Sequence, residues 1–269
     1  MQAATPGSQS PFDPTGSGSA AKPGHIVDPN ANASLTIRGL HAGYGHTDVL
    51  HGIDLTLAKG ESMCLVGPNG AGKSTVLNAV FGLADVHLGQ IRVGSADVLR
   101  LSAAARLRDA GVAYVLQDDA IFPDLSVEQN LRLGAYLMRD RHSIQNEVER
   151  VLVMYPRLAA RRRQRAGVLS GGERRTLEIA RALMMRPRLL LIDEPSIGLE
   201  PRAISQIFEL LRGLVGPGGT SILLVEQNIQ EGLKFADQGL VMVAGRVVAL
   251  GKGSELMRDR TIGQMFFGQ

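Results

Sequence analysis

One eight-residue segment, GPNGAGKS at residues 67–74, limits the folds open to this chain more than any other feature. It has the spacing G-x-x-x-x-G-K-S, follows the apolar run MCLVG and opens the helix-like segment STVLNAVFGL. A strand that enters a glycine-rich turn and leaves as a helix directs backbone N–H groups and a helix N-terminus at phosphate. The segment therefore predicts a phosphate-binding loop after a buried parallel strand.

The residues of this loop have separate expected roles. Lys73 is expected to reach the β- and γ-phosphates of ATP, and the Ser74 hydroxyl to bind Mg²⁺. The alternative, an ordinary glycine-rich turn, is disfavoured because the strand and the helix flank the loop in the required order. The residues expected to contact the nucleotide here are Gly67, Pro68, Asn69, Gly70, Ala71, Gly72, Lys73, Ser74 and Thr75.

A second motif, LLLIDEP, ends an apolar run with two carboxylates, Asp193 and Glu194. The carboxyl end of a parallel strand is where α/β sheets place ligands. Asp193 is expected to hold Mg²⁺, directly or through water, and Glu194 to act on the attacking water as general base. Two acids that only cap the turn before Pro195 are the alternative, and the phosphate-binding loop makes it the weaker one.

A third segment, LSGGERRTLEIARAL at 169–183, predicts a helix with a capping box between Ser170 and Glu173. Glycine is unfavourable in the first turn of a helix, so Gly171 and Gly172 indicate more than capping. Glycine permits close approach of a ligand to the backbone, and a helix start binds anions. We therefore expect this helix start to contact phosphate as well.

Short apolar runs alternate with segments of helical spacing along the rest of the chain, which predicts an α/β fold with a parallel sheet and crossover helices. Residues 1–34 are rich in Pro, Gly, Ser and Ala and are expected to form a disordered tail. The main domain is expected over residues 35–258, with a helical insertion over 101–168 and a C-terminal segment over 259–269.

Composition excludes several classes of protein. The formal net charge of +3 is too small to argue for a nucleic-acid partner. The one cysteine, Cys64, lies in the apolar strand and leaves no disulfide framework, which is typical of a reducing, intracellular setting. No run of eighteen apolar residues and no secretory signal is visible, so any work at a membrane is expected to depend on partner proteins.

The order of the motifs along the chain resembles that in the ATP-binding subunit of ABC transporters, and the resemblance covers about residues 35–255. In chain order the motifs are Lys73, Gln117, LSGGE, LLLIDEP and LLVEQN. LSGG about twenty residues before the acidic strand is the discriminating feature, because other P-loop ATPases lack it. The resemblance implies a P-loop NTPase fold, here an ABC ATPase domain, with a mostly parallel core sheet, an antiparallel β subdomain and a helical subdomain.

The resemblance also implies roles for further residues. Tyr44 would stack on adenine, and Gln117 would contact Mg²⁺ or the attacking water. Two ATP molecules would lie between head-to-tail cassettes, each gripped by one loop and covered by the LSGG segment of the other chain. The residues expected on that covering segment are Ser170, Gly171, Gly172 and Glu173.

Two positions depart from the family pattern. Gln227 occupies the place where many members carry a histidine that contacts the γ-phosphate, and an amide donates a hydrogen bond without positive charge. We include Gln227 among the catalytic candidates with Glu194 and Gln117. Glu200 stands where an aspartate is common, so its carboxylate is one methylene longer.

Several segments are similar to those of the ATPases of branched-chain amino acid importers: VEQN, LSGGE, DEPSIGLEP, YPRLAARRRQRAG and MFFGQ. Amide or urea importers and a lipopolysaccharide exporter are alternatives, and a non-transport ABC ATPase is a further one. The resemblance implies an identical or sibling second cassette, two membrane permease subunits and, indirectly, an extracytoplasmic solute-binding protein. The chain would then lie at the cytoplasmic face of the membrane.

Overall fold

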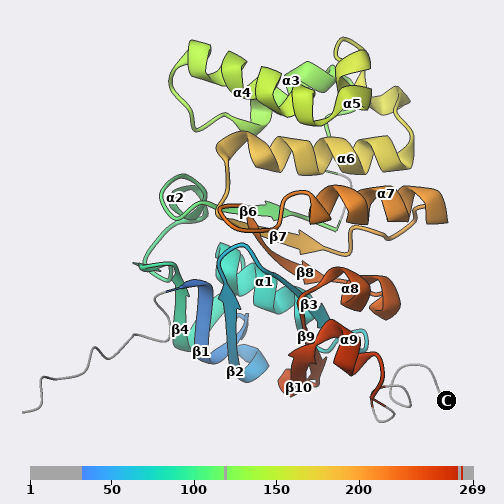
Figure 1. Ribbon diagram of the computed structural model, residues 1–269. Coiled ribbons are helices and arrows are strands. Elements are labelled where there is room, and N and C mark those ends of the chain that lie inside the picture. Colours follow the sequence, from blue (N-terminus) through green and yellow to red (C-terminus); the bar gives the residue numbers. More distant parts are fainter. Residues whose placement is uncertain (1–31, 118–119, 260–261, 263–269) are drawn as a thin grey trace, which may run out of the picture.

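The computed structural model describes residues 32–117, 120–259 and 262, coloured in Figure 1. Its first layer is an antiparallel sheet of four strands in the order β2-β1-β4-β5. These strands are β1 (Ala33–Tyr44), β2 (Thr47–Ala58), β4 (Asp85–Val93) and β5 (Ala96–Asp97). The strand β1 thus starts two residues before residue 35, the predicted start of the main domain, and most of the predicted tail, residues 1–31, lies outside the described part of the chain.

The second layer is a six-stranded core sheet in the order β10-β9-β3-β8-β7-β6. All neighbours are parallel except the β9–β10 hairpin. Its strands are β3 (Ser62–Val66), β6 (Val112–Val115), β7 (Leu189–Asp193), β8 (Ser221–Val225), β9 (Gln238–Val243) and β10 (Arg246–Lys252). The predicted fold class, mostly parallel with an antiparallel β subdomain, is confirmed.

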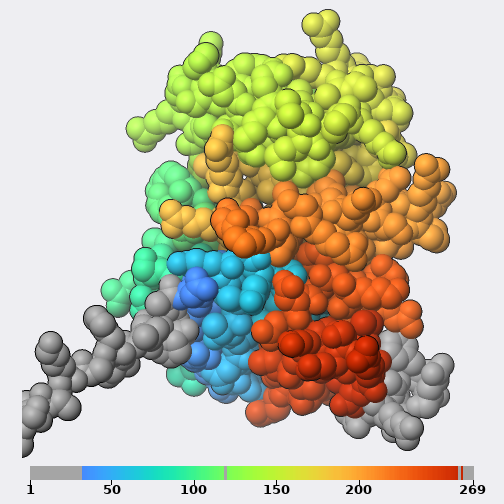
Figure 2. Space-filling view, in the orientation of Figure 1, coloured from blue at the N-terminus to red at the C-terminus, as the bar shows by residue number. Residues whose placement is uncertain are grey.

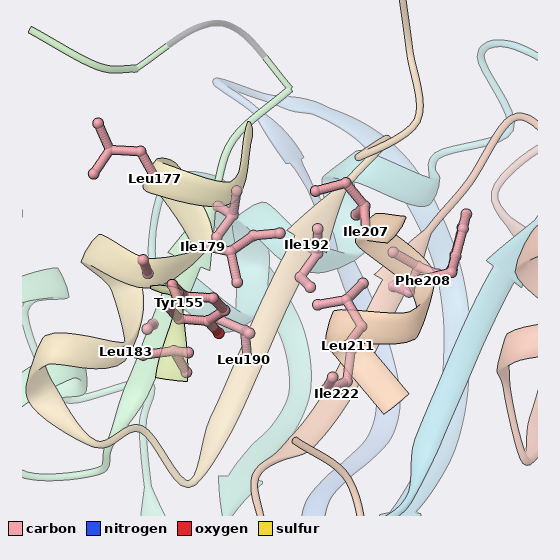
Figure 3. Close-up of a cluster of buried hydrophobic side chains, with 14 of the residues drawn as sticks. Tyr155, Leu177, Ile179, Leu183, Leu190, Ile192, Ile207, Phe208, Leu211 and Ile222 are labelled. Carbon is pink, nitrogen blue, oxygen red and sulfur yellow. The ribbon is translucent and has the colours of Figure 1, made fainter. Parts of the chain in front are cut away.

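Alternating side chains of the core strands face two separate hydrophobic clusters. Met63 and Leu65 of β3 pack with α1 (Lys73–Phe81) and the antiparallel sheet, whereas Cys64 and Val66 face the helices on the other side. Figure 3 shows the second cluster, where Ile179 of α6, Ile192 of β7 and Ile207 of α7 converge. Buried on both faces, β3 is held rigidly at the end that carries the phosphate-binding loop.

Helices cover the core sheet and form a separate lobe at the top of Figures 1 and 2. The lobe consists of α3, α4 and α5: α3 and α5 pack on α6, and α4 packs on α3 and α5. The span 101–168 also contains α2 and the edge strand β6, so it does not consist of the lobe alone. The helices not yet given are α2 (Ala103–Arg108), α3 (Val127–Gly134), α4 (Arg141–Met154), α5 (Pro156–Ala160), α6 (Gly171–Ala182), α7 (Pro201–Arg212), α8 (Ile229–Phe235) and α9 (Gly253–Leu256).

Hydrogen bonds at helix starts explain several of these boundaries. Ser126 closes a capping box with Gln129 at α3, and the Asp140 carboxylate accepts from the Ser143 N–H at α4. Within the described residues, no helix has the length and apolar character needed to cross a membrane. Only Asp259 and Ile262 of the predicted C-terminal segment are described.

Candidate nucleotide-binding site

The phosphate-binding loop connects β3 to α1 at the carboxyl edge of the core sheet. Gly70 and Gly72 have φ angles of 78° and 93°, a backbone conformation that glycine adopts without steric cost. The Lys73 ammonium donates to the carbonyl oxygens of Gly67 and Pro68 at 2.9 and 3.0 Å. Burial lowers the pKa of Lys73, while the charges of Glu194 and Asp193 oppose that shift. The loop therefore holds an almost fully buried cation against its own carbonyl oxygens.

Two oxygen ligands lie side by side where the resemblance implies Mg²⁺. The Ser74 hydroxyl donates to Oδ1 of Asp193 at 3.1 Å, and Asp193 Oδ2 accepts from the Tyr114 hydroxyl at 3.2 Å. Burial raises the pKa of Asp193. Mg²⁺ prefers oxygen ligands, so the Ser74 hydroxyl and the Asp193 carboxylate fit this cation.

Glu194 follows directly and has a φ of 46°, which is uncommon for a residue other than glycine. Its Oε2 accepts from Gln117 Nε2 at 3.1 Å, and its N–H donates to the carbonyl of Val225. Burial raises the pKa of Glu194, and the nearby charge of Asp193 raises it further. A carboxyl group with a raised pKa, held in place by an amide, suits a general base.

A cavity of about 440 Å³ is lined by half of the predicted site residues. The predicted residues that do not line it are Tyr44, Gly67, Pro68, Ala71, Asp193 and the segment Ser170–Glu173. The lining consists of Val49, Asn69, Gly70, Gly72, Lys73, Ser74, Thr75, Gln117, Glu194, Ile197 and Gln227. The structure thus joins residues of three predicted motifs, from Asn69 to Gln227, around one opening and leaves the LSGG segment outside it.

Tyr44 reaches the same network from the antiparallel sheet. Its hydroxyl accepts from Asn78 Nδ2 at 2.8 Å, and Asn78 Oδ1 lies 3.1 Å from the Tyr114 hydroxyl, which contacts Asp193. The ring of Tyr44 remains half exposed. Sequence reasoning missed Asn78 and Tyr114, because no motif marks a residue whose role is to contact two others.

The predicted capping box at α6 is present. Glu173 Oε2 accepts from the Ser170 N–H at 3.0 Å, and Ser170 Oγ accepts from the Glu173 N–H at 3.4 Å. Gly172 has a packing reason as well, because a Cβ there would lie 2.9 Å from Cβ of Ala203 on α7. Close helix packing therefore accounts for Gly172 without a ligand. Ser170 and Gly171 stay exposed at the helix start.

A buried ion pair on α6 fixes the segment that carries Gln117. Arg175 and Glu178 are almost fully buried and lie 2.7 Å apart. The Arg175 guanidinium also donates to the carbonyls of Leu116 and Gln117, both at 2.9 Å, and Glu178 Oε1 accepts from the Ala120 N–H at 2.8 Å. In the sequence, only the spacing of three residues between Arg175 and Glu178 on a predicted helix indicated that they could pair.

We expect Arg175→Met to lower the free energy of unfolding by about 3–5 kcal/mol, because the buried carboxylate of Glu178 would lose the guanidinium charge 2.7 Å away. Arg108→Met is the matched control: its ion pair with Asp109 is half exposed and should contribute about 1 kcal/mol or less. Urea unfolding of both variants tests this difference. Equal losses would show that the buried pair does not hold α6 to the Gln117 segment.

Gln227 depends on a neighbour that the sequence did not single out. Glu226 is fully buried, and its Oε1 accepts from Ser196 Oγ at 2.7 Å and from the N–H groups of Gln227 and Asn228 at 2.8 and 2.9 Å. Glu226 therefore ties the loop after β7 to the turn after β8. This connection places Gln227 at the rim of the cavity.

Comparison with known proteins agrees with this geometry: the family model for the ABC transporter matches residues 50–197. The chain belongs to the ABC transporter family. It is an ATP-binding protein of this family, and such proteins bind and hydrolyse ATP to power transport. The resemblance inferred from the motifs is thereby confirmed.

This ABC protein matches individual relatives over nearly their whole length. It is 37% identical to the probable branched-chain amino acid transport ATP-binding protein LivF of Archaeoglobus fulgidus, over 85% of this chain and 96% of that one. It is 40% identical to the high-affinity branched-chain amino acid transport ATP-binding protein BraG of Pseudomonas aeruginosa, over 84% and 95%. The lipopolysaccharide export ATP-binding protein LptB of Escherichia coli K12 is 32% identical, over 88% and 98%.

Solved structures agree on the fold. A nucleotide-free ATP-binding cassette from an ABC transporter superposes with a TM-score of 0.78, covering 88% of this chain and 100% of that chain at 24% identity. The cbiO1 protein of Clostridium perfringens, described as part of an ABC transporter complex, has a TM-score of 0.76 at 27% identity, over 86% and 93%.

Proposed function

We propose that this ABC protein powers the import of branched-chain amino acids. The observation that carries the substrate class is the identity of 37–40% to LivF and BraG over almost their full length, against 32% to the lipopolysaccharide exporter LptB. No residue of the nucleotide site would contact the solute. The solute would be selected by permease subunits and by a separate binding protein.

Glu194 acts as the general base in this proposal, and Gln117 orients it through their 3.1 Å hydrogen bond. Lys73 gives up its two carbonyl contacts and turns to the β- and γ-phosphates. Gln227, at the cavity rim, donates an amide hydrogen bond to the terminal phosphate. Tyr44 offers its exposed ring to adenine while Asn78 holds its hydroxyl.

Ser74 and Asp193 would hold Mg²⁺, with Gln117 as a further contact. Their oxygens already face each other at 3.1 Å, so little rearrangement is needed. The bound cation would neutralise charge on the phosphate oxygens. Tyr114 keeps Asp193 oriented from the opposite side.

A second cassette completes the site in this proposal. The cavity lining includes nothing from Ser170–Glu173, yet Ser170 and Gly171 are exposed at the N-terminus of a twelve-residue helix. A helix N-terminus carries about half a positive charge and free N–H donors. In a head-to-tail pair, these groups would cover the γ-phosphate that the other chain binds. The partner chain is either a second copy or a sibling cassette.

The helical lobe offers a surface for the membrane subunits. Phe122, Leu133 and Tyr136 are 51%, 38% and 66% exposed, which leaves large apolar side chains in water around α3. A helix of a permease subunit that covered them would couple this lobe to transport. The protein would then sit at the cytoplasmic face of the membrane.

Uptake measurements test the substrate class. A strain that lacks the gene should lose high-affinity uptake of radiolabelled leucine, isoleucine and valine. The wild-type gene should restore uptake, and a Glu194→Gln gene should not. Loss of urea or short-amide uptake instead, or a defect in lipopolysaccharide export, would reject branched-chain import in favour of that alternative.

A further inference from the structure

Three histidines that are separate in the sequence meet on the outer part of the antiparallel sheet. His41 of β1 and His51 of β2 are direct cross-strand partners, and Asp48 of β2 lies beside them. One ligand atom from each of these three residues lies within 4.8 Å of the others. The third histidine, His87 of β4, contacts Asp48 through Nδ1 at 2.5 Å.

The two oxygens of Asp48 have different neighbours. Oδ1 contacts His87, whereas Oδ2 lies 3.5 Å from Nδ1 of His41. His87 also contacts the carbonyl oxygen of Gly45 through Nε2, at 3.0 Å. Both nitrogens of His87 are therefore occupied, and Oδ2 is the oxygen of Asp48 that lies near His41.

We propose that His41, Asp48 and His51 bind one transition-metal ion of the Zn²⁺ class. Two imidazoles and one carboxylate are a common ligand set for this ion, and water would fill the fourth position. His87 would be an outer contact that orients the carboxylate, as outer-shell partners do in known metal centres. This ion would be separate from the Mg²⁺ proposed between Ser74 and Asp193.

The surroundings leave room for the ligands to close on an ion. A tetrahedral site with bonds of about 2.1 Å has ligand atoms about 3.4 Å apart, so the set must contract by up to about 1.4 Å. The side chains of His41 and Asp48 are about one-third exposed and can rotate. Gly52 and Gly245 border the imidazoles: a Cβ would lie 3.7 Å from His41 Nε2 and 2.9 Å from His51 Cδ2, respectively.

The charge around the cluster is compatible with a cation. Asp85 adds a second carboxylate nearby, where it accepts from the Gly45 N–H at 2.9 Å. A positively charged side chain, Arg246, also lies nearby: its guanidinium donates to the backbone carbonyl of His51 at 3.3 Å. Because this hydrogen bond is made to the backbone, it does not involve the imidazole nitrogens of His51.

The test is metal binding by the full-length, tag-free protein after EDTA treatment. Zn²⁺ is titrated calorimetrically without nucleotide and with excess Mg²⁺, which competes for oxygen ligands such as Ser74 and Asp193. We expect about one Zn²⁺ per chain, and Co²⁺ should give the visible spectrum of a four-coordinate ion with nitrogen and oxygen ligands. Octahedral Co²⁺ with water ligands only, or no binding, would overturn the proposal.

Variants then assign the ligands. His41→Gln and His51→Gln should each weaken Zn²⁺ binding by more than 100-fold, and His87→Gln by about 10- to 100-fold as expected for an outer contact. His142→Gln, on α4 in the helical lobe, is the matched control and should bind as the wild type does. Circular dichroism verifies folding. Unchanged affinity in a folded His41→Gln/His51→Gln double variant would place the ion elsewhere and refute this site.

Discussion

Glu194→Gln is expected to reduce steady-state ATP hydrolysis by at least about 100-fold, because a positioned general base contributes roughly 10²–10⁴ to the rate. Glutamine keeps the size of the side chain and an oxygen for the Gln117 amide, but it cannot accept a proton from water. ATP binding should survive, since Lys73, Ser74 and Asp193 are untouched. The variant should therefore accumulate as an ATP-bound pair of chains, detectable by size-exclusion chromatography with Mg²⁺ and ATP.

Glu209→Gln is the control for this variant. Glu209 is an exposed residue of α7 and is not among the residues that line the cavity, so the hydrolysis rate of this control should stay within a few-fold of wild type. Phosphate release must be measured with the membrane partners present, because isolated cassettes can be idle. Wild-type turnover by Glu194→Gln would remove Glu194 from the role of base.

Lys73→Met is expected to weaken ATP binding by about 100-fold, or about 3 kcal/mol, as for the loss of a hydrogen bond between charged groups. The ammonium is almost fully buried, donates to two loop carbonyls and lies within range of the charges of Asp193 and Glu194. Hydrolysis should fall further still, because charge on the phosphate grows towards the transition state.

Lys252→Met, at an exposed end of β10, serves as the comparison and should bind ATP normally. Fluorescence titration with a labelled ATP measures both affinities, and thermal unfolding verifies that each variant is folded. Equal affinity of Lys73→Met and wild type would mean that the glycine-rich loop holds the phosphates through its backbone alone.

Local sequence patterns determined much of this protein. The loop at 67–74, the capping box of Ser170 and Glu173, and the acidic end of β7 could all be predicted, because each depends on residues that are neighbours along the chain or on one helix. The alternation of apolar strands and helices also predicted a mostly parallel sheet. These features follow from local geometry and from the burial of apolar side chains.

Only the tertiary structure decided which distant polar groups meet. Tyr114 and Asp193 contact each other because β6 and β7 are paired in parallel, and Arg175 contacts the Gln117 segment because α6 packs beside β6. His41 and His87 come together through the register of β1 against β4, which includes an irregularity next to His41. Strand register and crossover packing are set by the summed burial of the whole core, so no short stretch of sequence contains them.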